Sequence, residues 1–465
     1  MEKNKFYYGW WVVLSGFLIM AIAYASIVSC QGLFIIPVTE ELGVSRVAFS
    51  TTTACLALGL VIGSLFTGTL IKKYGLKKIM CISCVIITIC LIGFSFAQAM
   101  WQFYALGITM GIAFPGLTNI AVSIMINNWF GKKKKGFAMS LVFAGSGVGG
   151  MILMVVLNQL IQGIGWRQAY AVNALAIFIV LMPFIWFVIK ETPSEKGLNR
   201  LGDATETNGS AEKEEVDANW QKKFGILFIS VFLMCVANNA ILNHQVPYFR
   251  EVGFSVDKAA AYAAVALGAL TIGKVVLGII FDKLGIQKGA FVANVMLVLA
   301  VIALLILAKM NIFIYFYIVF YGVGAAAATV SPPLLTGSVV PEKYYAKYVG
   351  LINVAVGLGA IVGAMFCAKL YDLYNQYSFA WKVLVITAAI IIPLQLVALH
   401  TNHEIMQTKD DKPLFSTETT TNVSVVFSTI FRVDFYLWHG RIPMPFSLVL
   451  LKIHLFLCAG HRNIK

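Results

Sequence analysis

The chain repeats itself at an offset of 210 residues, and the repeat falls where long apolar segments meet loops. Residues 37–45, PVTEELGVS, are matched by residues 247–255, PYFREVGFS, with Pro, Glu, Gly and Ser in register. A second motif matches at the same offset, in which Gly68, Lys73, Gly75 and Lys78 correspond to Gly278, Lys283, Gly285 and Lys288. Two tandem copies of one apolar unit indicate a membrane protein whose halves surround a central site.

Composition indicates that lipid surrounds most of this chain. Its 465 residues are 59% hydrophobic and 12% charged, with a mean hydropathy of +0.83, which is too little polar surface for soluble domains of this size. Apolar runs of about 20 residues, long enough to cross a bilayer, predict an all-α membrane protein of twelve helices in two pseudo-symmetric six-helix bundles. The runs are 8–36, 47–71, 77–97, 101–127, 137–162, 168–189, 222–249, 258–281, 289–308, 311–336, 346–370 and 379–400.

Changes in composition divide the chain into four parts. Residues 1–190 are predicted to form the first six-helix bundle, and residues 222–406 the second. Between them, residues 191–221 are rich in Glu, Asp, Asn, Gly and Thr, which indicates a solvated linker. Residues 407–465 are Thr-rich and then basic, have no counterpart in the first half, and are interpreted as an atypical tail.

Lys and Arg are concentrated in alternate loops. By the positive-inside rule, this predicts that both core termini and the central linker lie in the cytoplasm. We expect a multi-pass protein of the plasma (inner) membrane. The net charge of +14 then comes mostly from the Lys and Arg residues that orient the helices in the membrane. Because these charges are spread over membrane-flanking loops, they argue against nucleic acid as a partner. The first apolar run is too long for the core of a signal peptide, so we expect it to remain as a signal anchor.

No pattern of metal, cofactor or enzyme chemistry stands out. Cys81 and Cys84 form a C-x-x-C within the third apolar run, with no second pair and no His partner nearby, so packing is the favoured interpretation. A His-Glu-x-x-His motif, paired membrane carboxylates and a nucleophile elbow are also missing. We therefore expect no metal and no cofactor, and the protein is not predicted to be an enzyme.

Several motifs resemble those of a known family. GTLIKKYGLKK at 68–78 and GIIFDKLGIQK at 278–288 resemble the loop signature of the major facilitator superfamily, which joins helices 2 and 3 and again helices 8 and 9. Five further segments resemble the branch that contains oxalate:formate antiporters and monocarboxylate transporters: YGWWVV at 8–13, ELGVSR at 41–46, AGSGVGG at 144–150, GWR at 165–167 and HQVPY at 244–248. The resemblance covers about residues 6–400 and implies secondary transport by alternating access.

The loop signature has a physical role of its own. Glycine at a helix end permits close helix approach, the basic residues hold the loop at the headgroups, and Asp282 can pair with a neighbouring cation or a helix N-terminus. Lys72 occupies the acidic position in the first half. A solvated loop that only sets topology is the alternative. The predicted gating residues are Gly68, Lys72, Lys73, Gly75, Gly278, Asp282, Lys283 and Gly285.

Lys274 is the outstanding polar residue at membrane depth. It precedes Asp282 by eight residues, which places it about 12 Å into a hydrocarbon layer about 30 Å thick. A Lys at that depth costs on the order of 3 kcal/mol to insert and usually faces a cavity or a partner. A snorkelling Lys is the alternative, but its stem would have to reach a surface two turns away. We therefore predict that Lys274 binds the substrate.

The resemblance sharpens this prediction. Where the oxalate:formate branch has Gly-Arg-x-x-x-Gly in its eighth helix, this chain has Gly273-Lys274-Val-Val-Leu-Gly278. The Lys that the resemblance implies in the eleventh helix falls at Val356. One cation suits a monoanion better than a dicarboxylate, and Lys lacks the planar fork that binds a carboxylate bidentately.

Four further polar residues are candidates for substrate binding. His244 lies near the outer end of the seventh helix and can titrate in a useful range, with Asn239 and Asn243 beside it. Asn119 begins a polar stripe on the fourth helix. A structural histidine and interhelical hydrogen bonds are the alternatives. Apart from Asp282 at a helix end, no Asp or Glu lies inside a predicted helix, so the choice between a coupled proton and a counter-anion stays open.

These observations predict a monomeric secondary active transporter in the lipid bilayer that moves a small, monocarboxylate-like organic anion by alternating access. Two alternatives remain. One is a non-transporting sensor or receptor on the same fold, which would bind without flux. The other is a facilitator-type exporter of another small solute.

Overall fold

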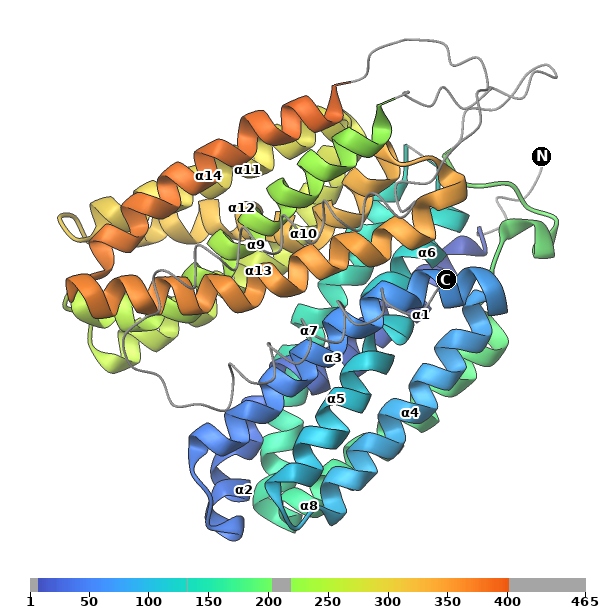
Figure 1. Cartoon of the computed structure of the whole chain (residues 1–465), viewed down its shortest axis with the longest axis horizontal. Helices are drawn as coiled ribbons and strands as arrows, with labels where there is room; N and C mark the ends of the chain where they lie inside the picture. Colours follow the sequence, from blue (N-terminus) through green and yellow to red (C-terminus); the bar gives the residue numbers. More distant parts are fainter. Residues whose placement is uncertain (1–6, 132, 203–218, 401–465) are drawn as a thin grey trace, which may run out of the picture. The chain divides into compact units, whose positions relative to one another are not determined.

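The computed structural model describes residues 7–131, 133–202 and 219–400, which belong to one compact unit (Figure 1). These residues are almost entirely helical, and an isolated bridge between Phe130 and Leu201 is the only β pairing among them. Twelve of the described helical segments are long and apolar enough to cross a membrane, which confirms the predicted fold class. Residues 203–218 of the predicted linker and the whole predicted tail, 407–465, lie outside the described residues.

The spans of the first half are α1 (Gly9–Ile19) with η1 (Met20–Ser29), α3 (Arg46–Tyr74), α4 (Leu76–Phe96), α5 (Met100–Leu117) with α6 (Asn119–Trp129), α7 (Lys135–Ile164), and α8 (Trp166–Pro183) with η3 (Phe184–Val188). Those of the second half are α9 (Trp220–Glu251), α10 (Val256–Leu284), α11 (Ile286–Leu307), α12 (Phe313–Val339), α13 (Tyr345–Tyr374) and α14 (Tyr377–Leu399). Short elements complete the set: η2 (Gln31–Phe34), α2 (Ile35–Leu42), η4 (Pro193–Lys196) and η5 (Glu342–Tyr344).

The first span is shorter than its apolar run. The helix that begins at Gly9 ends at Ser29, and η2 and α2 follow as separate elements, whereas hydropathy predicted one helix over residues 8–36. The break falls at Cys30, and Gln31 and Gly32 then begin the 3-10 helix η2 between two strongly apolar stretches. A hydropathy scan averages over such a short break, although Gly is a poor helix former.

The two halves of the sequence fold in the same way. Helices α3 and α10 both follow a serine whose hydroxyl caps the helix: Ser45 Oγ accepts from the amide of Ala48 at 3.2 Å and Ser255 Oγ from that of Lys258 at 3.4 Å. Both helices end at a glycine with positive φ, +92° at Gly75 and +81° at Gly285. The repeat at offset 210 is therefore a repeat of helix boundaries.

Glycine pairs bring helix backbones into contact. A Cβ at Gly59 would lie 2.3 Å from the carbonyl oxygen of Ile108 and 3.0 Å from Cα of Gly111. Helices α3 and α5 therefore pack backbone against backbone, which is how membrane helices associate without a hydrophobic driving force.

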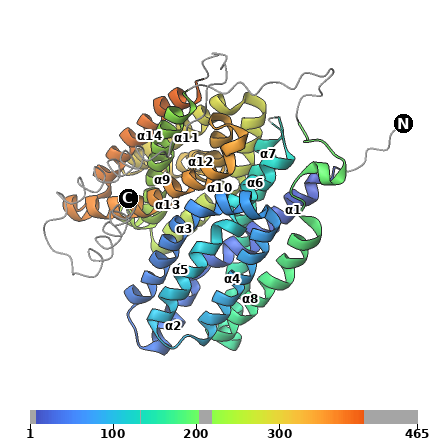
Figure 2. The same cartoon turned by 45° about the vertical axis from the view of Figure 1, so that its right-hand side comes forward.

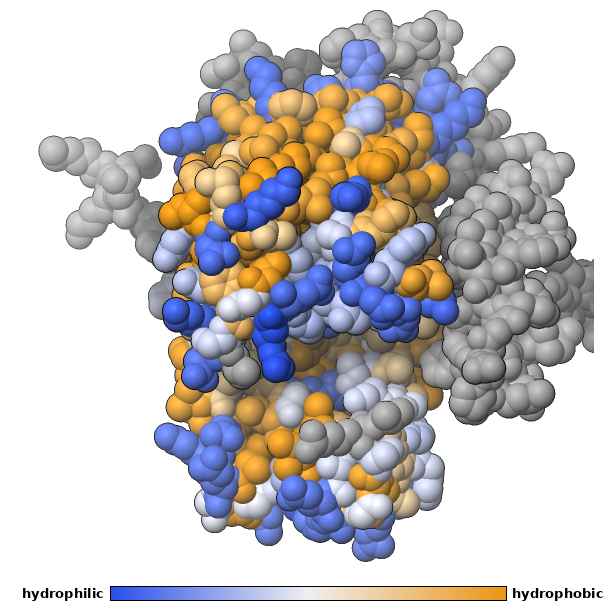
Figure 3. Space-filling view, turned by 90° about the vertical axis from the view of Figure 1, so that its left-hand side faces the viewer, coloured by the Kyte–Doolittle hydropathy of each residue, from blue (hydrophilic) through white to orange (hydrophobic). Residues whose placement is uncertain are grey.

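The halves meet mainly through two crossings, α7 with α10 and α3 with α13 (Figures 1 and 2). Both crossings lie toward the end that carries the loops after Tyr74 and Leu284, called the loop end below. Figure 3 looks onto the opposite end, the far end, and shows a hollow between the halves bordered by hydrophilic residues. The structure is thus closed at the loop end and open at the far end.

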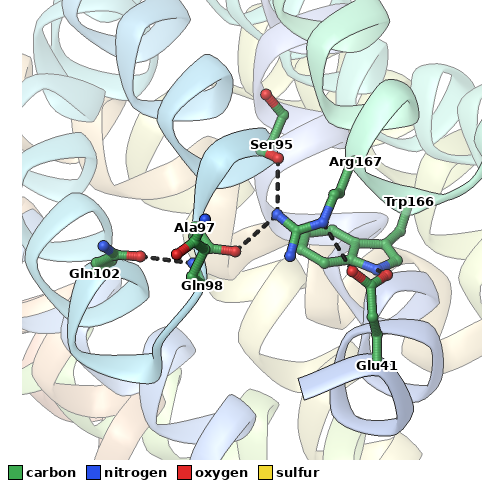
Figure 4. A network of polar contacts seen from close by, with 7 residues as sticks. All are labelled: Glu41, Ser95, Ala97, Gln98, Gln102, Trp166 and Arg167. Atoms are coloured by element: carbon green, nitrogen blue, oxygen red, sulfur yellow. Dashed lines mark hydrogen bonds and ion pairs between the residues drawn. The ribbon is translucent and has the colours of Figure 1, made fainter.

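A polar network fixes the far end of the first half (Figure 4). Glu41 accepts hydrogen bonds from Trp166 Nε1 at 2.5 Å and from Arg167 Nε at 2.9 Å. The guanidinium of Arg167 also donates to the carbonyl oxygens of Ser95 at 3.0 Å and Ala97 at 2.8 Å. The hydrogen bond from Arg167 lowers the pKa of Glu41 below its ordinary value, so the carboxylate stays ionised. This network connects α2, the end of α4 and the start of α8 by hydrogen bonds.

Candidate functional site

Lys274 lies where α10 crosses α7. Its Nζ donates to the hydroxyl of Ser146 at 2.8 Å and to the carbonyl oxygen of Phe143 at 3.3 Å. Both acceptors belong to the first half, whereas Lys274 belongs to the second. The residue is only 5% exposed, so it does not snorkel to the surface in this structure. The predicted substrate lysine thus links the two halves.

The charge of Lys274 has neutral partners only. In the described part of the chain, no carboxylate lies within ion-pair distance of its Nζ, and both of its acceptors are uncharged oxygens. An ammonium group carries three donors, so one donor has no acceptor among the described residues. An uncompensated buried charge is costly, and an anion that reached the ammonium would remove that cost. The crossing of α7 and α10 is therefore suited to an anionic ligand.

The other crossing contains neutral groups at the equivalent positions. At the repeat offset, Lys274 corresponds to Ser64 and Ser146 corresponds to Val356. Ser64 is fully buried, and its hydroxyl has no hydrogen-bond partner among the described residues. Val356, where the resemblance implied a second cation, is the repeat counterpart of Ser146. The two crossings thus share a backbone geometry but not a charge.

The polar residues predicted on the seventh helix form other contacts. The amide of Asn239 donates to the carbonyl oxygen of Cys235 at 2.9 Å, and that of Asn243 to the carbonyl oxygen of Asn239 at 2.7 Å. His244 Nδ1 lies 3.2 Å from the hydroxyl of Tyr377 at the start of α14. None of these three side chains hydrogen-bonds to Lys274. Their predicted role in substrate binding stays a prediction.

The polar stripe on the fourth helix is divided. Asn119 follows a break at Thr118 between α5 and α6, and its carbonyl oxygen accepts from the hydroxyl of Ser123 at 2.5 Å. Asn127, two turns later, accepts from Nζ of Lys135 at 2.5 Å near the loop end. The break partly exposes Asn119, which is compatible with its predicted role, whereas Asn127 belongs to the contacts that close the loop end.

Asp282 binds the N-terminus of α7 across the two halves. Its carboxylate accepts from the amides of Gly136 at 2.8 Å and Phe137 at 2.9 Å. Helix N-termini carry unsatisfied amides and a partial positive charge, so an anion is stabilised there. The backbones are close enough that a Cβ at Gly278 would lie 2.6 Å from the carbonyl oxygen of Gly136. In this structure Asp282 thus pairs with a helix N-terminus, and its role in gating stays a prediction.

Lys72 makes a different contact at the equivalent place. A Cβ at Gly68 would lie 1.9 Å from the carbonyl oxygen of Ala346, so α3 and α13 approach as closely as α10 and α7. Lys72 Nζ donates to the carbonyl oxygen of Lys343 at 3.3 Å. At the α3–α13 crossing, the ammonium of Lys72 thus binds a carbonyl oxygen, whereas at the α7–α10 crossing the carboxylate of Asp282 binds backbone amides. Of the other loop-signature residues, Lys73 lies over the ring of Tyr74 and Lys283 is exposed.

A third contact between the halves was not expected from the sequence. Residues 189–202, here called the strap, follow the sixth span and bind back to the first half: the amide of Leu201 donates to Trp129 O at 3.2 Å. Arg200 on the strap donates to Glu342 of the second half at 2.9 Å and to Asn127 O at 2.7 Å. The polar composition of residues 191–221 predicted a solvated linker, and an ion pair between residues this far apart in the chain leaves no local signal in the sequence.

Comparisons with known proteins agree with this geometry. The sequence model described as "Major Facilitator Superfamily" matches residues 13–364 and 227–457. Similar curated proteins include an uncharacterized MFS-type transporter, YcxA, of Bacillus subtilis (21% identity; 83% of this chain, 94% of that protein) and monocarboxylate transporter 12 of Rattus norvegicus (22%; 80% and 82%). The benzoate transport protein of Acinetobacter baylyi is 20% identical over 89% of this chain and 94% of its own.

Solved structures show the same fold. The major facilitator superfamily transporter FucP in the outward conformation superposes with a TM-score of 0.62 at 14% identity, covering 84% of this chain and 98% of FucP. The proton:xylose symporter XylE bound to 6-bromo-6-deoxy-D-glucose superposes with a TM-score of 0.64 at 15% identity, covering 86% and 96%.

Replacing the carboxylate at the N-terminus of α7 should weaken closure of the loop end. Asp282→Asn removes the charge and one acceptor, a loss of about 1–2 kcal/mol that shifts the closed-to-open ratio by roughly 5- to 30-fold. We expect turnover to fall more than substrate affinity, because Asp282 binds the other half. Asp257→Asn makes the same change in the exposed first turn of α10 and is the matched control. Equal turnover of the Asp282 variant and the parent would contradict a gating role.

Charge reversal should identify the strap as a latch. Arg200→Glu and Glu342→Arg each bring like charges together and should raise the open fraction of the loop end by roughly two- to five-fold, the range for a partly exposed pair. The double variant restores the ion pair and should recover most of the closure. Spin labels at Lys78 and Lys288, exposed positions in opposite halves, report the distance distribution. An unchanged distribution in both single variants would exclude a latch.

Proposed function

The chain belongs to the major facilitator superfamily, and from this premise we propose that it is a secondary active transporter that moves a small organic monoanion by alternating access. One observation carries the proposal: a buried lysine lies at the crossing of the two halves with neutral partners only. The names of two relatives, a monocarboxylate transporter and a benzoate transport protein, point to substrates of the same charge.

The proposed cycle uses the contacts between the halves. With the loop end closed by Asp282 and by Arg200–Glu342, the anion enters through the hollow at the far end and reaches Lys274. The anion then compensates the ammonium charge. Rocking of the halves breaks the loop-end contacts and opens the site to the other side of the membrane.

The number of cations favours a monoanion. Lys274 is the cation at this crossing, and the corresponding positions of the other crossing are Ser64 and Val356. A dicarboxylate would leave its second charge without a partner there, at a high desolvation cost. The single ammonium also suits loose, monodentate binding of one carboxylate.

Counterflow in proteoliposomes tests the proposal directly. Vesicles preloaded with formate, lactate, pyruvate, benzoate or oxalate should show the strongest exchange with a monoanion and the weakest with oxalate. Exchange that needs an internal anion indicates a counter-anion, and uptake driven by a pH gradient indicates a coupled proton. Binding without flux would instead indicate a sensor on this fold.

The proposed orientation places the loop end in the cytoplasm of a plasma-membrane protein that functions as a monomer. Most Lys residues of the loops lie at that end, which is the distribution that the positive-inside rule requires. A reporter inserted between residues 203 and 218 should therefore read as cytoplasmic. A reporter of matched size after Gln98, in the far-end loop between α4 and α5, should read as external. The reverse pattern would invert the proposed cycle.

Removal of the Lys274 charge should weaken anion binding steeply. Lys274→Met keeps most of the side-chain volume, so the helix should insert at least as well as in the parent, while anion affinity falls on the order of 100-fold. Lys274→Arg should keep partial function, because the charge remains and the guanidinium restores bidentate geometry.

Lys258→Met is the matched control, since it removes the same charge from an exposed position on α10. Affinities are measured by titration of purified protein and by uptake in liposomes. If the Lys274→Met variant binds and transports a carboxylate as the parent does, the substrate is neutral or cationic and the proposed function is wrong.

A further inference from the structure

We infer that Ser146 is a positioning residue that competes with the transported anion for the ammonium group of Lys274. This inference rests on the proposed function and extends it, because it assigns a role to a residue that the sequence pattern did not single out. It also predicts that loss of the Ser146 hydroxyl raises the affinity for the anion, whereas loss of a residue that binds substrate would lower it.

The hydrogen bonds of Ser146 are fully defined. Its hydroxyl donates to the carbonyl oxygen of Phe143 at 2.8 Å and accepts from Lys274 Nζ at 2.8 Å. Lys274 Nζ donates to the same carbonyl at 3.3 Å, so the three groups form a closed triangle. The single O–H of Ser146 is directed at Phe143, which leaves its lone pair for the ammonium. Ser146 thus acts toward Lys274 as an acceptor.

Close packing on both sides holds Ser146 in place. A Cβ at Gly145 would lie 2.4 Å from the carbonyl oxygen of Phe17 on α1, and a Cβ at Gly147 would lie 2.1 Å from Oγ1 of Thr271 on α10. The backbone around Ser146 is therefore fixed between two helices. Ser146 itself is 7% exposed, so bulk water is poorly placed to replace its hydroxyl.

The competition follows from where the acceptors lie. Ser146 and Phe143 hold Lys274 against the first half, and the bond to Ser146 joins the two halves while the loop end is closed. When α7 and α10 separate during transport, this bond must break. An anion on Lys274 supplies a charged acceptor in place of the neutral ones, so binding of the anion releases the bridge.

The direction in which Ser146→Ala changes anion affinity distinguishes a residue that competes with the anion from one that binds it. If Ser146 competes with the anion, Ser146→Ala frees Lys274 and should tighten anion binding by about 10-fold, the usual effect of one hydrogen bond to a charged group. If Ser146 instead binds the anion, the same variant should bind more weakly. Ser146→Thr keeps the hydroxyl and should bind as the parent does. Ser230→Ala removes a fully buried hydroxyl that likewise donates to a carbonyl oxygen of its own helix, that of Leu227 on α9, and it is the matched control away from Lys274.

The Kd is measured on the purified full chain by calorimetric titration with the monoanion, among formate, lactate, pyruvate and benzoate, that gives the strongest counterflow. We expect a lower Kd for Ser146→Ala alone, and no effect of Ser146→Ala when Lys274 is already Met. A Kd that is unchanged or higher for Ser146→Ala, with binding still lost in Lys274→Met, would overturn this inference and leave the proposed function intact. Unchanged binding in Lys274→Met would overturn the proposed function itself.

Discussion

The close approach of two helix pairs, α7 with α10 and α3 with α13, is the constraint on which the other contacts between the halves depend. Each pair meets at a glycine whose missing side chain lets a backbone carbonyl come within contact: Gly278 beside Gly136 O and Gly68 beside Ala346 O. Only at such a separation can Asp282 reach the amides at the start of α7 and Lys274 reach Ser146. The closed loop end is thus a consequence of backbone packing, which charged groups then reinforce.

The repeat makes the two crossings equivalent in backbone, and the sequence makes them different in chemistry. At the α7–α10 crossing, a carboxylate binds a helix N-terminus and a buried ammonium binds neutral oxygens. At the α3–α13 crossing, Lys72 binds a carbonyl, and the counterpart of Lys274 is Ser64. The pair Arg200–Glu342, which attaches the strap to the segment before α13, adds a contact on this second side. The loop end is therefore closed by different kinds of interaction at the α7–α10 crossing and at the α3–α13 crossing.

The parts of this structure that are local in sequence were predictable. Helix boundaries at Ser45 and Gly75 follow from capping and from positive φ, and both signals recur at the repeat offset. The depth of Lys274 follows from counting residues back from Asp282. The acceptors of Lys274 and the partner of Arg200 were not predictable, because they come from residues more than 100 positions away. Ser146 did leave a faint signal, since it is a polar residue between two glycines in an apolar helix.

The energetics of a single buried ammonium connect closure to transport. While α7 and α10 are in contact, Ser146 and Phe143 supply two neutral acceptors for Lys274. Separation of these helices removes both acceptors, and an ammonium without partners at that depth is strongly disfavoured. In the proposed cycle, a carboxylate bound to the ammonium stays with it through the movement, so the loaded protein would change state at a lower cost than the protein whose lysine has no anion. Under the proposed function, the buried cation at the crossing would thereby be enough to make the movement depend on the presence of an anion.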